Sequence, residues 1–360
     1  MELKPEQIEA YLTSLFCQKT SVLGLQVLGE TPEDRNVKSY GYGVPVRIDY
    51  ETASVRRSAV LHTISPGPFG HENMPDRAQI LLGQHHAFNR LPNHVRSLDV
   101  GGFDSNGSMV SLGDLEELYL LTEYVEGEPY ALDLERLGQI AGEQDLARAD
   151  ALCDYLVEIH RERPDPDRPG LYVRRIRELV GHGECVMGLA DSFPADTLVT
   201  PQVLEEIEKC FVGWRWRLKG LTHRLRSVHG DFHPWNILFG PGTAFRVLDR
   251  SRGEFGEPAD DVACLTINYL FFSLCRTARL EGAFDQLFRR FWNRYLEKTG
   301  DAEMLRVVGP FFAFRGLVLV NPLWYPNLSD TVRHRILAFT LHVLDSGDFD
   351  PALVNDYCDA

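Results

Sequence analysis

The chain has 360 residues, of which 44% are hydrophobic and 25% are charged, and its formal net charge is -15. The length suits two lobes or domains, and the composition is typical of a soluble globular protein. A balance this acidic argues against a nucleic-acid backbone as the main partner. It is compatible with a cationic small substrate, although a surface that is acidic for solubility alone is the simpler explanation.

The seven cysteines are odd in number and include no Cys-x-x-Cys pair. This pattern favours reduced thiols in the cytoplasm over a disulfide framework or a zinc site. The N-terminal segment is an amphipathic helix pattern with acids and does not resemble a signal peptide. The longest apolar run, Val262–Cys275, contains polar residues and is too short to span a bilayer. We therefore expect a cytoplasmic protein with no membrane partner, of unknown oligomeric state.

The first third of the chain is predicted to be β-rich after an N-terminal helix. The predicted elements are a helix over residues 5–17, strands over 21–28, 44–50 and 58–64, a helix over 76–91 and a strand over 118–124. The second and third strands have the pattern of a hairpin or meander. The Gly/Pro break at residues 126–129 follows the last strand and is a candidate hinge.

Beyond this hinge the chain is predicted to be mostly helical. The predicted elements are helices over residues 144–161, 202–226, 259–276, 282–297, 302–319 and 330–345, and two short strands over 237–239 and 245–248. The basic residues near the end of the 202–226 helix favour a solvated or interface face over a nucleic-acid site.

The run HGDFHPWN, residues 229–236, contains an acid, Asp231, and an amide five residues later, Asn236. A second acid, Asp249, follows Asp231 by 18 residues at the end of a predicted strand. One carboxylate can accept a hydroxyl proton, while the amide oxygen and the other carboxylate can hold Mg²⁺, which prefers oxygen ligands. The spacing therefore predicts a phosphoryl-transfer site.

The same run allows a second interpretation as a metal-hydrolase site. His229, Asp231 and His233 alternate, so on a strand they would share one face and could bind zinc or another transition metal. Gly230 and Pro234 favour a shaped loop over a continuous strand. No other dense His/Asp cluster in the sequence supplies the remaining ligands. The sequence thus favours phosphoryl transfer.

The run HGDFHPWNILF, the hairpin after it, Asp249 and the segment Gly256–Ala263 resemble the aminoglycoside phosphotransferase family in order and spacing. That family shares the protein-kinase-like fold with choline kinases. A weaker likeness includes the hinge Leu120–Gly127 and the helix that ends at His160, so the resemblance covers about residues 20–300. It implies an α+β, bilobal protein-kinase-like fold. A small antiparallel β-rich N-lobe, 1–123, would bind nucleotide, and a larger helical C-lobe, 124–360, would hold the catalytic loop and the substrate.

The resemblance also implies roles for the residues of the loop. Asp231 matches the catalytic base, and Asn236 and Asp249 match the Mg²⁺ ligands. His229 matches a histidine that braces the loop. His233 is either a partner of Asp231 or a histidine whose hydrogen bonds are satisfied within the loop. Asp261 matches an acid that ties the following helix to the loop, and it is also a candidate for substrate contact.

The N-lobe departs from the family pattern. The family's phosphate-binding lysine aligns with His62, and the glutamate that pairs with that lysine aligns with Gln84. A neutral His62 could form a hydrogen-bonded couple with Gln84, and a protonated His62 could contact phosphate. Other candidate cations to substitute for the lysine are Lys38, Arg47 and Arg57. Further candidates for nucleotide binding are the turn residues Gly41 and Gly43 and the hinge residues Glu123 and Val125.

Two further segments are candidates for contacts near the substrate. Arg250 and Arg252 follow Asp249 and either approach the transferred phosphate or, as we favour, pair with Glu254 or Asp261. His182 and Glu184, in a Gly-rich turn, are candidates for substrate contact, although a plain helix end is the simpler interpretation of this turn. The corner Asn321–Pro326 is another candidate for the wall of a substrate pocket, although we expect Trp324 to pack in the core.

These residues together predict a kinase that transfers the γ-phosphate of ATP to the hydroxyl of a small molecule, with Mg²⁺ as cofactor. GTP is an open alternative to ATP. The competing hypothesis is a nucleotide- or metabolite-binding pseudokinase, suggested by His62 and Gln84. The intact Asp231, Asn236 and Asp249 argue against it. The sequence does not identify the substrate, which need not be an antibiotic.

Overall fold

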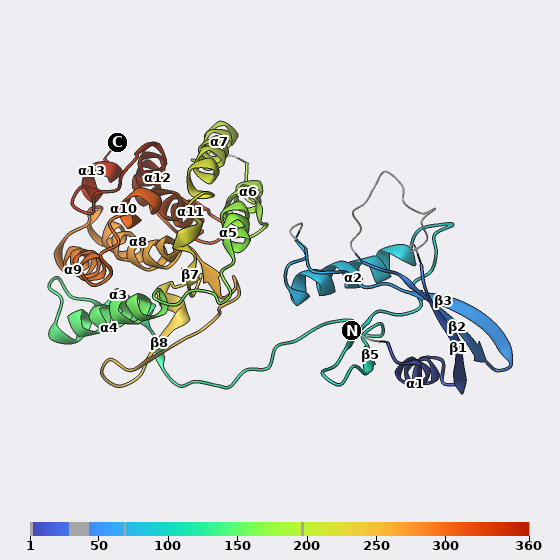
Figure 1. Cartoon of the computed structure of the whole chain (residues 1–360). Helices are drawn as coiled ribbons and strands as arrows, with labels where there is room; N and C mark the ends of the chain where they lie inside the picture. Colours follow the sequence, from blue (N-terminus) through green and yellow to red (C-terminus); the bar gives the residue numbers. More distant parts are fainter. Residues whose placement is uncertain (1–2, 29–42, 68–69, 196–197, 360) are drawn as a thin grey trace. The chain divides into compact units, whose positions relative to one another are not determined.

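The computed structural model divides into two compact units, Met1–Thr122 and Glu123–Ala360 (Figure 1). It describes residues 3–28, 43–67, 70–195 and 198–359. Within these ranges no helix is long and apolar enough to cross a membrane.

The N-terminal unit is built on a three-stranded antiparallel sheet with strand order β1-β2-β3. Its elements are α1 (Pro5–Phe16), β1 (Thr20–Val27), β2 (Val46–Thr52), β3 (Val55–Leu61), α2 (Met74–Phe88), β4 (Gly101–Phe103) and β5 (Met109–Ser111). Ala53 and Ser54 join β2 to β3 with φ of 48° and 60°, the positive values that tight hairpin turns require. A small core of Ile8 and Leu12 from α1 packs with Ile48 and Tyr50 from β2.

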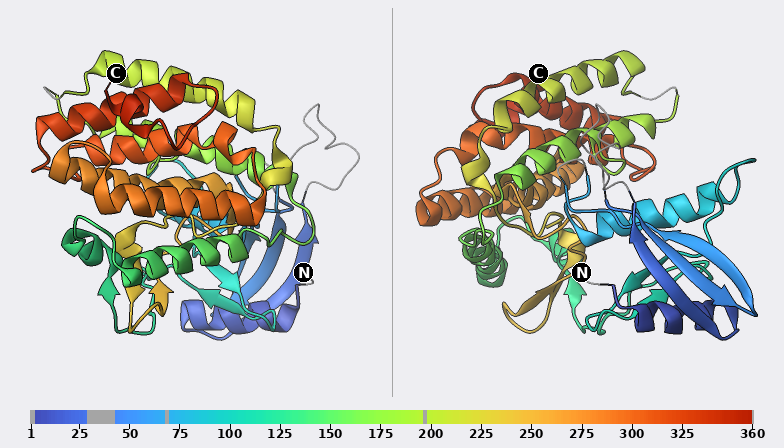
Figure 2. Two further views of the ribbon diagram at one scale, coloured as in Figure 1. Left: turned by 90° about the vertical axis from the view of Figure 1, so that its left-hand side faces the viewer. Right: turned by 45° about the vertical axis from the view of Figure 1, so that its right-hand side comes forward.

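The C-terminal unit is mainly helical (Figure 2), and short strands among its described residues form three pairs. Its elements are β6 (Glu128–Pro129), α3 (Tyr130–Arg136), α4 (Glu143–Ile159), α5 (Pro169–Gly181), α6 (Val186–Asp191), α7 (Pro201–Leu218), β7 (Arg226–Ser227), β8 (Ile237–Phe239), β9 (Phe245–Val247), β10 (Phe255–Gly256), α8 (Pro258–Thr277), α9 (Gly282–Thr299), α10 (Met304–Val307), α11 (Gly309–Val320), α12 (Asp330–Asp345) and α13 (Val354–Cys358).

Helices α8 and α11 form the centre of this unit, since nearly all their side chains are buried. Helix α9 packs against α8, and α12 packs against α11. At Gly316 in α11 an added Cβ would lie 2.1 Å from Thr340 Oγ1, so only glycine allows α11 and α12 to approach this closely.

Short strands of the C-terminal unit hold the two halves of the predicted catalytic motif. β7 pairs with β10, and β8 pairs with both β6 and β9. The HGDFHPWN loop connects β7 to β8, and Asp249 follows β9 by one residue, Leu248. The β8–β9 hairpin therefore returns the chain to Asn236, at the end of the loop.

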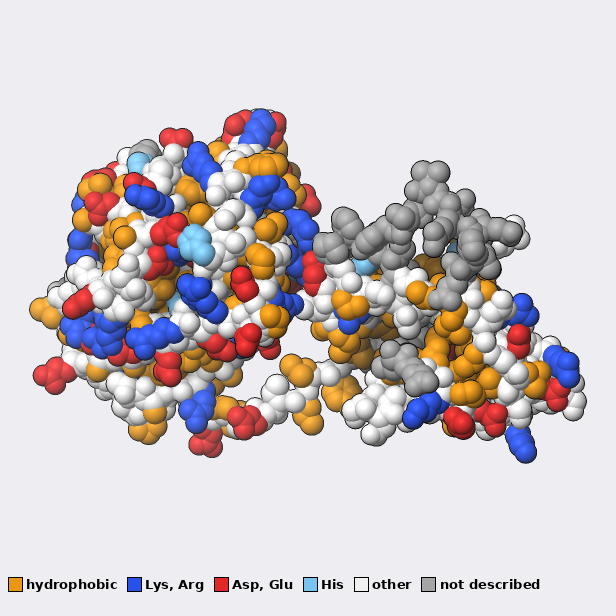
Figure 3. Space-filling view, viewed as in Figure 1, with side chains coloured by type: hydrophobic (Ala, Val, Ile, Leu, Met, Phe, Trp, Pro, Cys, Tyr) orange, Lys and Arg blue, Asp and Glu red, His pale blue; other side chains and the backbone are white. Residues whose placement is uncertain are grey.

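Most of the predicted elements are confirmed, including the β2–β3 hairpin, but three predictions are wrong. Residues 118–124 are extended but pair with no described strand, and hydrophobic side chains stand exposed along this segment (Figure 3). The 202–226 helix ends at Leu218 and is followed by a 3₁₀ turn and β7. The 302–319 helix is two helices, because Pro310 cannot continue a helix but fits its first turn.

Candidate active site

The HGDFHPWN run is a shaped loop, as Gly230 and Pro234 predicted. Gly230 has a φ of 86°, and an added Cβ there would lie 3.1 Å from Arg252 Cβ, so both the backbone and the space require glycine. Pro234 begins a 3₁₀ turn whose cap is His233, since His233 Nδ1 accepts a hydrogen bond of 3.2 Å from the Trp235 N–H.

The loop geometry removes the basis of the metal-hydrolase interpretation. That interpretation requires His229, Asp231 and His233 to share the face of a strand, and they lie in a loop. Nowhere in the described ranges do three or more His, Cys, Asp or Glu side chains form a group that could hold a metal ion.

Asp261 fastens the loop to the first turn of α8. Its carboxylate accepts hydrogen bonds from the backbone N–H groups of His229, at 2.8 Å, and Gly230, at 2.7 Å. The carboxylate is fully buried, and its Oδ2 lies 3.1 Å from His160 Nε2. Burial opposes the charge, but hydrogen bonds from His160 and the loop leave the pKa of Asp261 below its ordinary value. Both oxygens are occupied, which favours the positioning role over substrate contact.

His229 has the environment of a bracing residue. Its ring is buried, and Nδ1 accepts a hydrogen bond of 3.3 Å from the backbone N–H of Asp231. Burial lowers the pKa of His229 in spite of the nearby charges of Asp261 and Asp231. A neutral ring suits this role, because Nδ1 must stay unprotonated to accept the bond.

The two carboxylate oxygens of Asp231 have different neighbours. Oδ1 lies 2.5 Å from Arg315 Nη1, and Oδ2 lies 3.5 Å from His233 Nε2. Burial alone would raise the pKa of Asp231, but the His233 hydrogen bond and the charges of Arg315 and Arg252 hold it well below its usual range. Asp231 is therefore an ionised acceptor at neutral pH.

Arg315 was not among the candidates from the sequence. It lies in α11 and contacts the Gly230 carbonyl at 2.9 Å and Asp260 Oδ1 at 2.7 Å, in addition to Asp231. One signal could have found it: Arg315 is the only charged residue in the apolar helix Gly309–Val320. A lone charge at a buried position normally has a specific partner.

The candidate metal ligands come together at the open end of the β8–β9 hairpin. The N–H of Leu248 donates a hydrogen bond of 2.8 Å to the carbonyl of Asn236, so Asp249 is the residue after this bridge. Asn236 Nδ2 donates to the Asp231 carbonyl at 3.1 Å, which leaves the amide oxygen as the free end of that side chain. Asp249 has a φ of 55°, a conformation that Asp and Asn tolerate. Both donors are oxygens and fit Mg²⁺.

The two arginines after Asp249 do not make the ion pairs that we favoured. Arg250 donates to the backbone carbonyls of Val228, at 2.9 Å, and Glu254, at 2.8 Å. The Arg252 guanidinium lies over the Phe314 ring, 5.1 Å from its centroid. In the described part of the chain neither arginine pairs with a carboxylate of Glu254 or Asp261.

The turn that carries His182 and Glu184 is exposed, and His182 Nδ1 accepts a hydrogen bond of 3.3 Å from the Glu184 N–H. The next residue, Cys185, lies 3.9 Å from the guanidinium of Arg252, so the turn is near the segment that follows Asp249. In the 321–326 corner the prediction for Trp324 is wrong, since its side chain is 63% exposed.

Of the two alternatives for His62, the hydrogen-bonded couple with Gln84 is absent from the described part of the N-terminal unit. His62 follows the last residue of β3, Gln84 lies in α2, and both are exposed. Among the hydrogen bonds of the described residues none joins them. Their separation leaves His62 without the amide partner that would have fixed its ring.

The other nucleotide candidates are placed as follows. Gly43 lies against the end of β3, where an added Cβ would be 1.8 Å from the Thr63 carbonyl oxygen. Gly41 lies outside the described residues, as does Lys38. Glu123 and Val125 are in the extended segment before β6.

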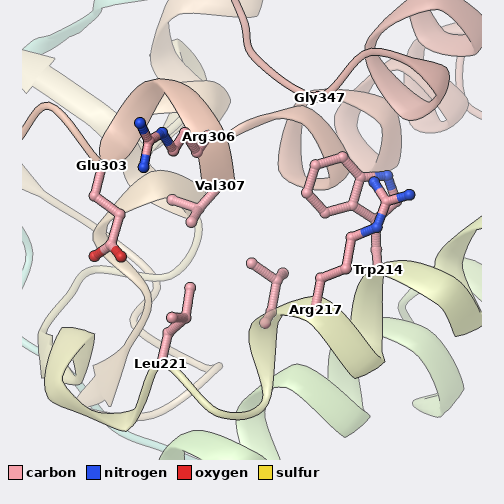
Figure 4. A pocket seen from close by; sticks show the side chains of 8 residues that line it. Trp214, Arg217, Leu221, Glu303, Arg306, Val307 and Gly347 are labelled. Carbon is pink, nitrogen blue, oxygen red and sulfur yellow. The ribbon is translucent and has the colours of Figure 1, made fainter.

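A cavity of about 250 Å³ lies apart from these residues (Figure 4). Trp214 and Arg217 of α7 line one side of it, and Glu303 and Arg306 line the other. The Arg217 guanidinium stacks 4.9 Å from the Trp214 ring centroid, so two of the lining side chains interact with each other. The cavity contains none of the predicted site residues.

The family model described as the phosphotransferase enzyme family matches residues 104–300, more than half of the chain. The protein therefore belongs to the phosphotransferase enzyme family. The match includes the HGDFHPWN loop, Asp249 and the start of α8, and it ends before Arg315. The small-molecule kinase class and the α+β protein-kinase-like fold follow from this membership. No curated protein matches the chain.

Solved structures similar to the chain include three small-molecule kinases. The amicoumacin kinase hAmiN, in complex with AMP-PNP, Ca²⁺ and Ami, is 13% identical, with 98% and 97% of the two chains covered and a TM-score of 0.42. The choline kinase LicA from Streptococcus pneumoniae is 13% identical, with 94% and 98% covered and a TM-score of 0.33. The aminoglycoside phosphotransferase APH(3'')-Id from Streptomyces rimosus is 17% identical, with 85% and 98% covered and a TM-score of 0.36. The family assignment rests on the family model alone.

Proposed function

We propose that the protein transfers the γ-phosphate of ATP to a hydroxyl group of a small molecule. The observation that carries this proposal is Asp231, an ionised and largely buried carboxylate at a loop whose other end carries Asn236 and, across the hairpin, Asp249. A hydroxyl acceptor would donate its hydrogen to Asp231 and be oriented for attack on the γ-phosphate.

The low pKa of Asp231 fits a positioning role better than early proton removal. Phosphoryl transfer passes through a loose transition state in which the proton is still largely bonded to the attacking hydroxyl oxygen. Catalysis then comes mainly from orientation and from neutralisation of phosphate charge. Mg²⁺, held by Asn236 and Asp249, would supply that neutralisation.

The acceptor is proposed to be a small molecule, and the net charge of -15 suits a cationic one. His182 and Glu184 are the proposed polar contacts to it, on the exposed turn beside Cys185. His62 is the proposed contact to the nucleotide phosphates, supported by its position at the end of β3 beside Gly43. Glu123 and Val125 are proposed to line the nucleotide base.

A pseudokinase is the second candidate, favoured by the lack of a hydrogen bond between His62 and Gln84 among the described residues. ADP release measured with Mg-ATP and a panel of hydroxyl compounds separates the two. Turnover that falls by about 10²-fold or more in Asp231→Asn supports the kinase. The matched change Asp285→Asn, on the surface of α9, should leave turnover unchanged. Binding of Mg-ATP without transfer to any compound would favour the pseudokinase.

A further inference from the structure

Arg315 connects the catalytic loop to a helix outside the family match. The residue is 7% exposed, and its guanidinium is bound on three sides: by Asp231, by the Gly230 carbonyl and by Asp260. Nη1 donates to Asp231, Nη2 donates to the Gly230 carbonyl and to Asp260, and Nε donates to Asp260 at 3.2 Å. Only the planar, five-donor fork of arginine can span these acceptors, because a lysine ammonium is a single point.

The contacts also determine which oxygen of Asp231 is left for a substrate. Oδ1 is held by Arg315 and has Cys264 Sγ at 4.0 Å, whereas among the described residues Oδ2 has a single polar neighbour, His233 Nε2, at 3.5 Å. The side-chain torsion of Asp231 is thereby fixed from the Oδ1 side. Because His233 Nδ1 accepts from Trp235, its Nε2 carries the proton and can share Oδ2 with a hydroxyl.

We propose that Arg315 is a positioning residue that holds Asp231 by Oδ1 and thereby presents Oδ2 to the acceptor hydroxyl. This inference rests on the proposed kinase function. Arg315 acts through Asp231 and does not itself bind phosphate, since all three of its nitrogens are engaged and its side chain is almost fully buried. Its removal would free a buried carboxylate to rotate, and small displacements of a reacting group reduce rates strongly.

The test compares Arg315 with a matched buried arginine. Arg224 is 5% exposed and binds the carboxylates of Glu257 and Asp301, none of them Asp231. We expect Arg315→Met to lower kcat by about 10²-fold, per folded molecule, with KM for ATP and acceptor changed less than about threefold. Arg315→Lys should recover only part of the loss. Arg224→Met should lower stability and leave kcat within about threefold of the wild type.

Guanidinium ion gives a second readout that a purely structural role would not move. Added to folded Arg315→Ala, it should raise kcat several-fold and have no effect on Arg224→Ala. The proposal is overturned if Arg315→Met keeps a kcat within about threefold of the wild type, or if Arg224→Met loses as much. Should the Met variant not fold, Arg315→Lys takes its place, and an unaltered kcat with lysine overturns the proposal equally.

A double-mutant cycle separates failure of this inference from failure of the proposed function. Arg315→Met should raise the unfolding equilibrium constant in the wild type. In an Asp231→Asn background we expect this increase to be smaller by a factor of about five or more, because the partner charge is already gone. This coupling needs no substrate. If Arg315 and Asp231 are coupled in stability but the wild-type protein shows no turnover, the kinase function is refuted. If the wild-type protein turns over but the two residues are not coupled, the role of Arg315 is refuted.

Discussion

His160 Nε2 lies 3.1 Å from Asp261 Oδ2, and this contact joins the end of α4 to the first turn of α8 beneath the catalytic loop. His160 is held in turn by Tyr295 of α9, whose hydroxyl is 2.8 Å from Nδ1. Three helices thus meet at the carboxylate that receives the N–H groups of His229 and Gly230. This buried charge therefore holds the start of the loop in place, next to the strands that flank the loop.

Asp261→Asn should destabilise the C-terminal unit by about 3 kcal/mol and abolish turnover. The amide keeps one acceptor but turns an NH₂ group toward a backbone N–H of His229 or Gly230, so one buried hydrogen bond is lost and two donors face each other. Urea unfolding measures the effect. The surface change Asp285→Asn should stay within about 0.5 kcal/mol of the wild type.

The comparison of the wild type with Asp261→Asn should also depend on pH. The pKa of Asp261 is lower in the folded state than its ordinary value of 3.8, so its charge stabilises the fold fully above that value. The stabilisation is lost as pH falls below 3.8 toward the folded pKa. The stability gap between wild type and Asp261→Asn should be constant from pH 7 to 5 and shrink below about pH 4. A gap that shrinks between pH 7 and 5 would contradict the assignment.

Gly230→Ala should cost about 1–3 kcal/mol of stability and reduce turnover, because its φ is positive and the added methyl group would lie only 3.1 Å from Arg252 Cβ, which must move to accommodate it. Two glycines serve as controls. Gly242→Ala has a positive φ and open space, so it reports backbone strain alone, and Gly183→Ala has neither constraint. Equal losses for Gly230 and Gly242 would show that contact with Arg252 is unimportant.

Asp249→Asn should weaken the response to Mg²⁺ without harming the fold. Asparagine tolerates the φ of 55° as well as aspartate does, so only the charge changes. The Mg²⁺ concentration for half-maximal activity should rise about tenfold or more, and Mn²⁺ binding measured by calorimetry in the presence of nucleotide should weaken in parallel. Asn236→Ala should behave in the same way. An unchanged Mn²⁺ affinity in both variants would remove this pair from the metal site.

His62→Lys should raise kcat/KM for ATP by about tenfold, because lysine stays charged at neutral pH. The position is exposed, so the fold should tolerate the change. Val60→Lys, in β3 two residues earlier and 44% exposed, controls for added positive charge. If the control gains as much as His62→Lys, His62 is not the nucleotide-facing position.

The local parts of the site could be predicted from the sequence, because Asp231, Asn236 and the residues around them are fixed by spacing along one loop. The hairpin that brings Asp249 to Asn236 follows from β8 and β9, which are short but clearly patterned. Trp324 was misplaced because an aromatic residue between helices fits a core and a surface equally well.

Arg315 could not be predicted in the same way. Its partners Asp231 and Asp260 lie 84 and 55 residues away, and only the packing of α11 on α8 brings them together. The extended segment 118–124 shows the opposite failure, where β-prone residues have no partner strand among those described. Strand propensity without a neighbour does not make a strand.

Gly316 stands next to Arg315 and touches Thr340 across the contact between α11 and α12. A larger side chain there requires the Thr340 side chain or the helix pair to shift, and a shift of α11 would move the Arg315 guanidinium relative to the loop. With Arg315 in the proposed positioning role, turnover would be adjustable from the C-terminal helices. Substitutions at Gly316 or Thr340 would then change turnover although neither residue contacts a ligand. Sequence changes in this helix pair would allow related chains to differ in rate while they keep the same loop.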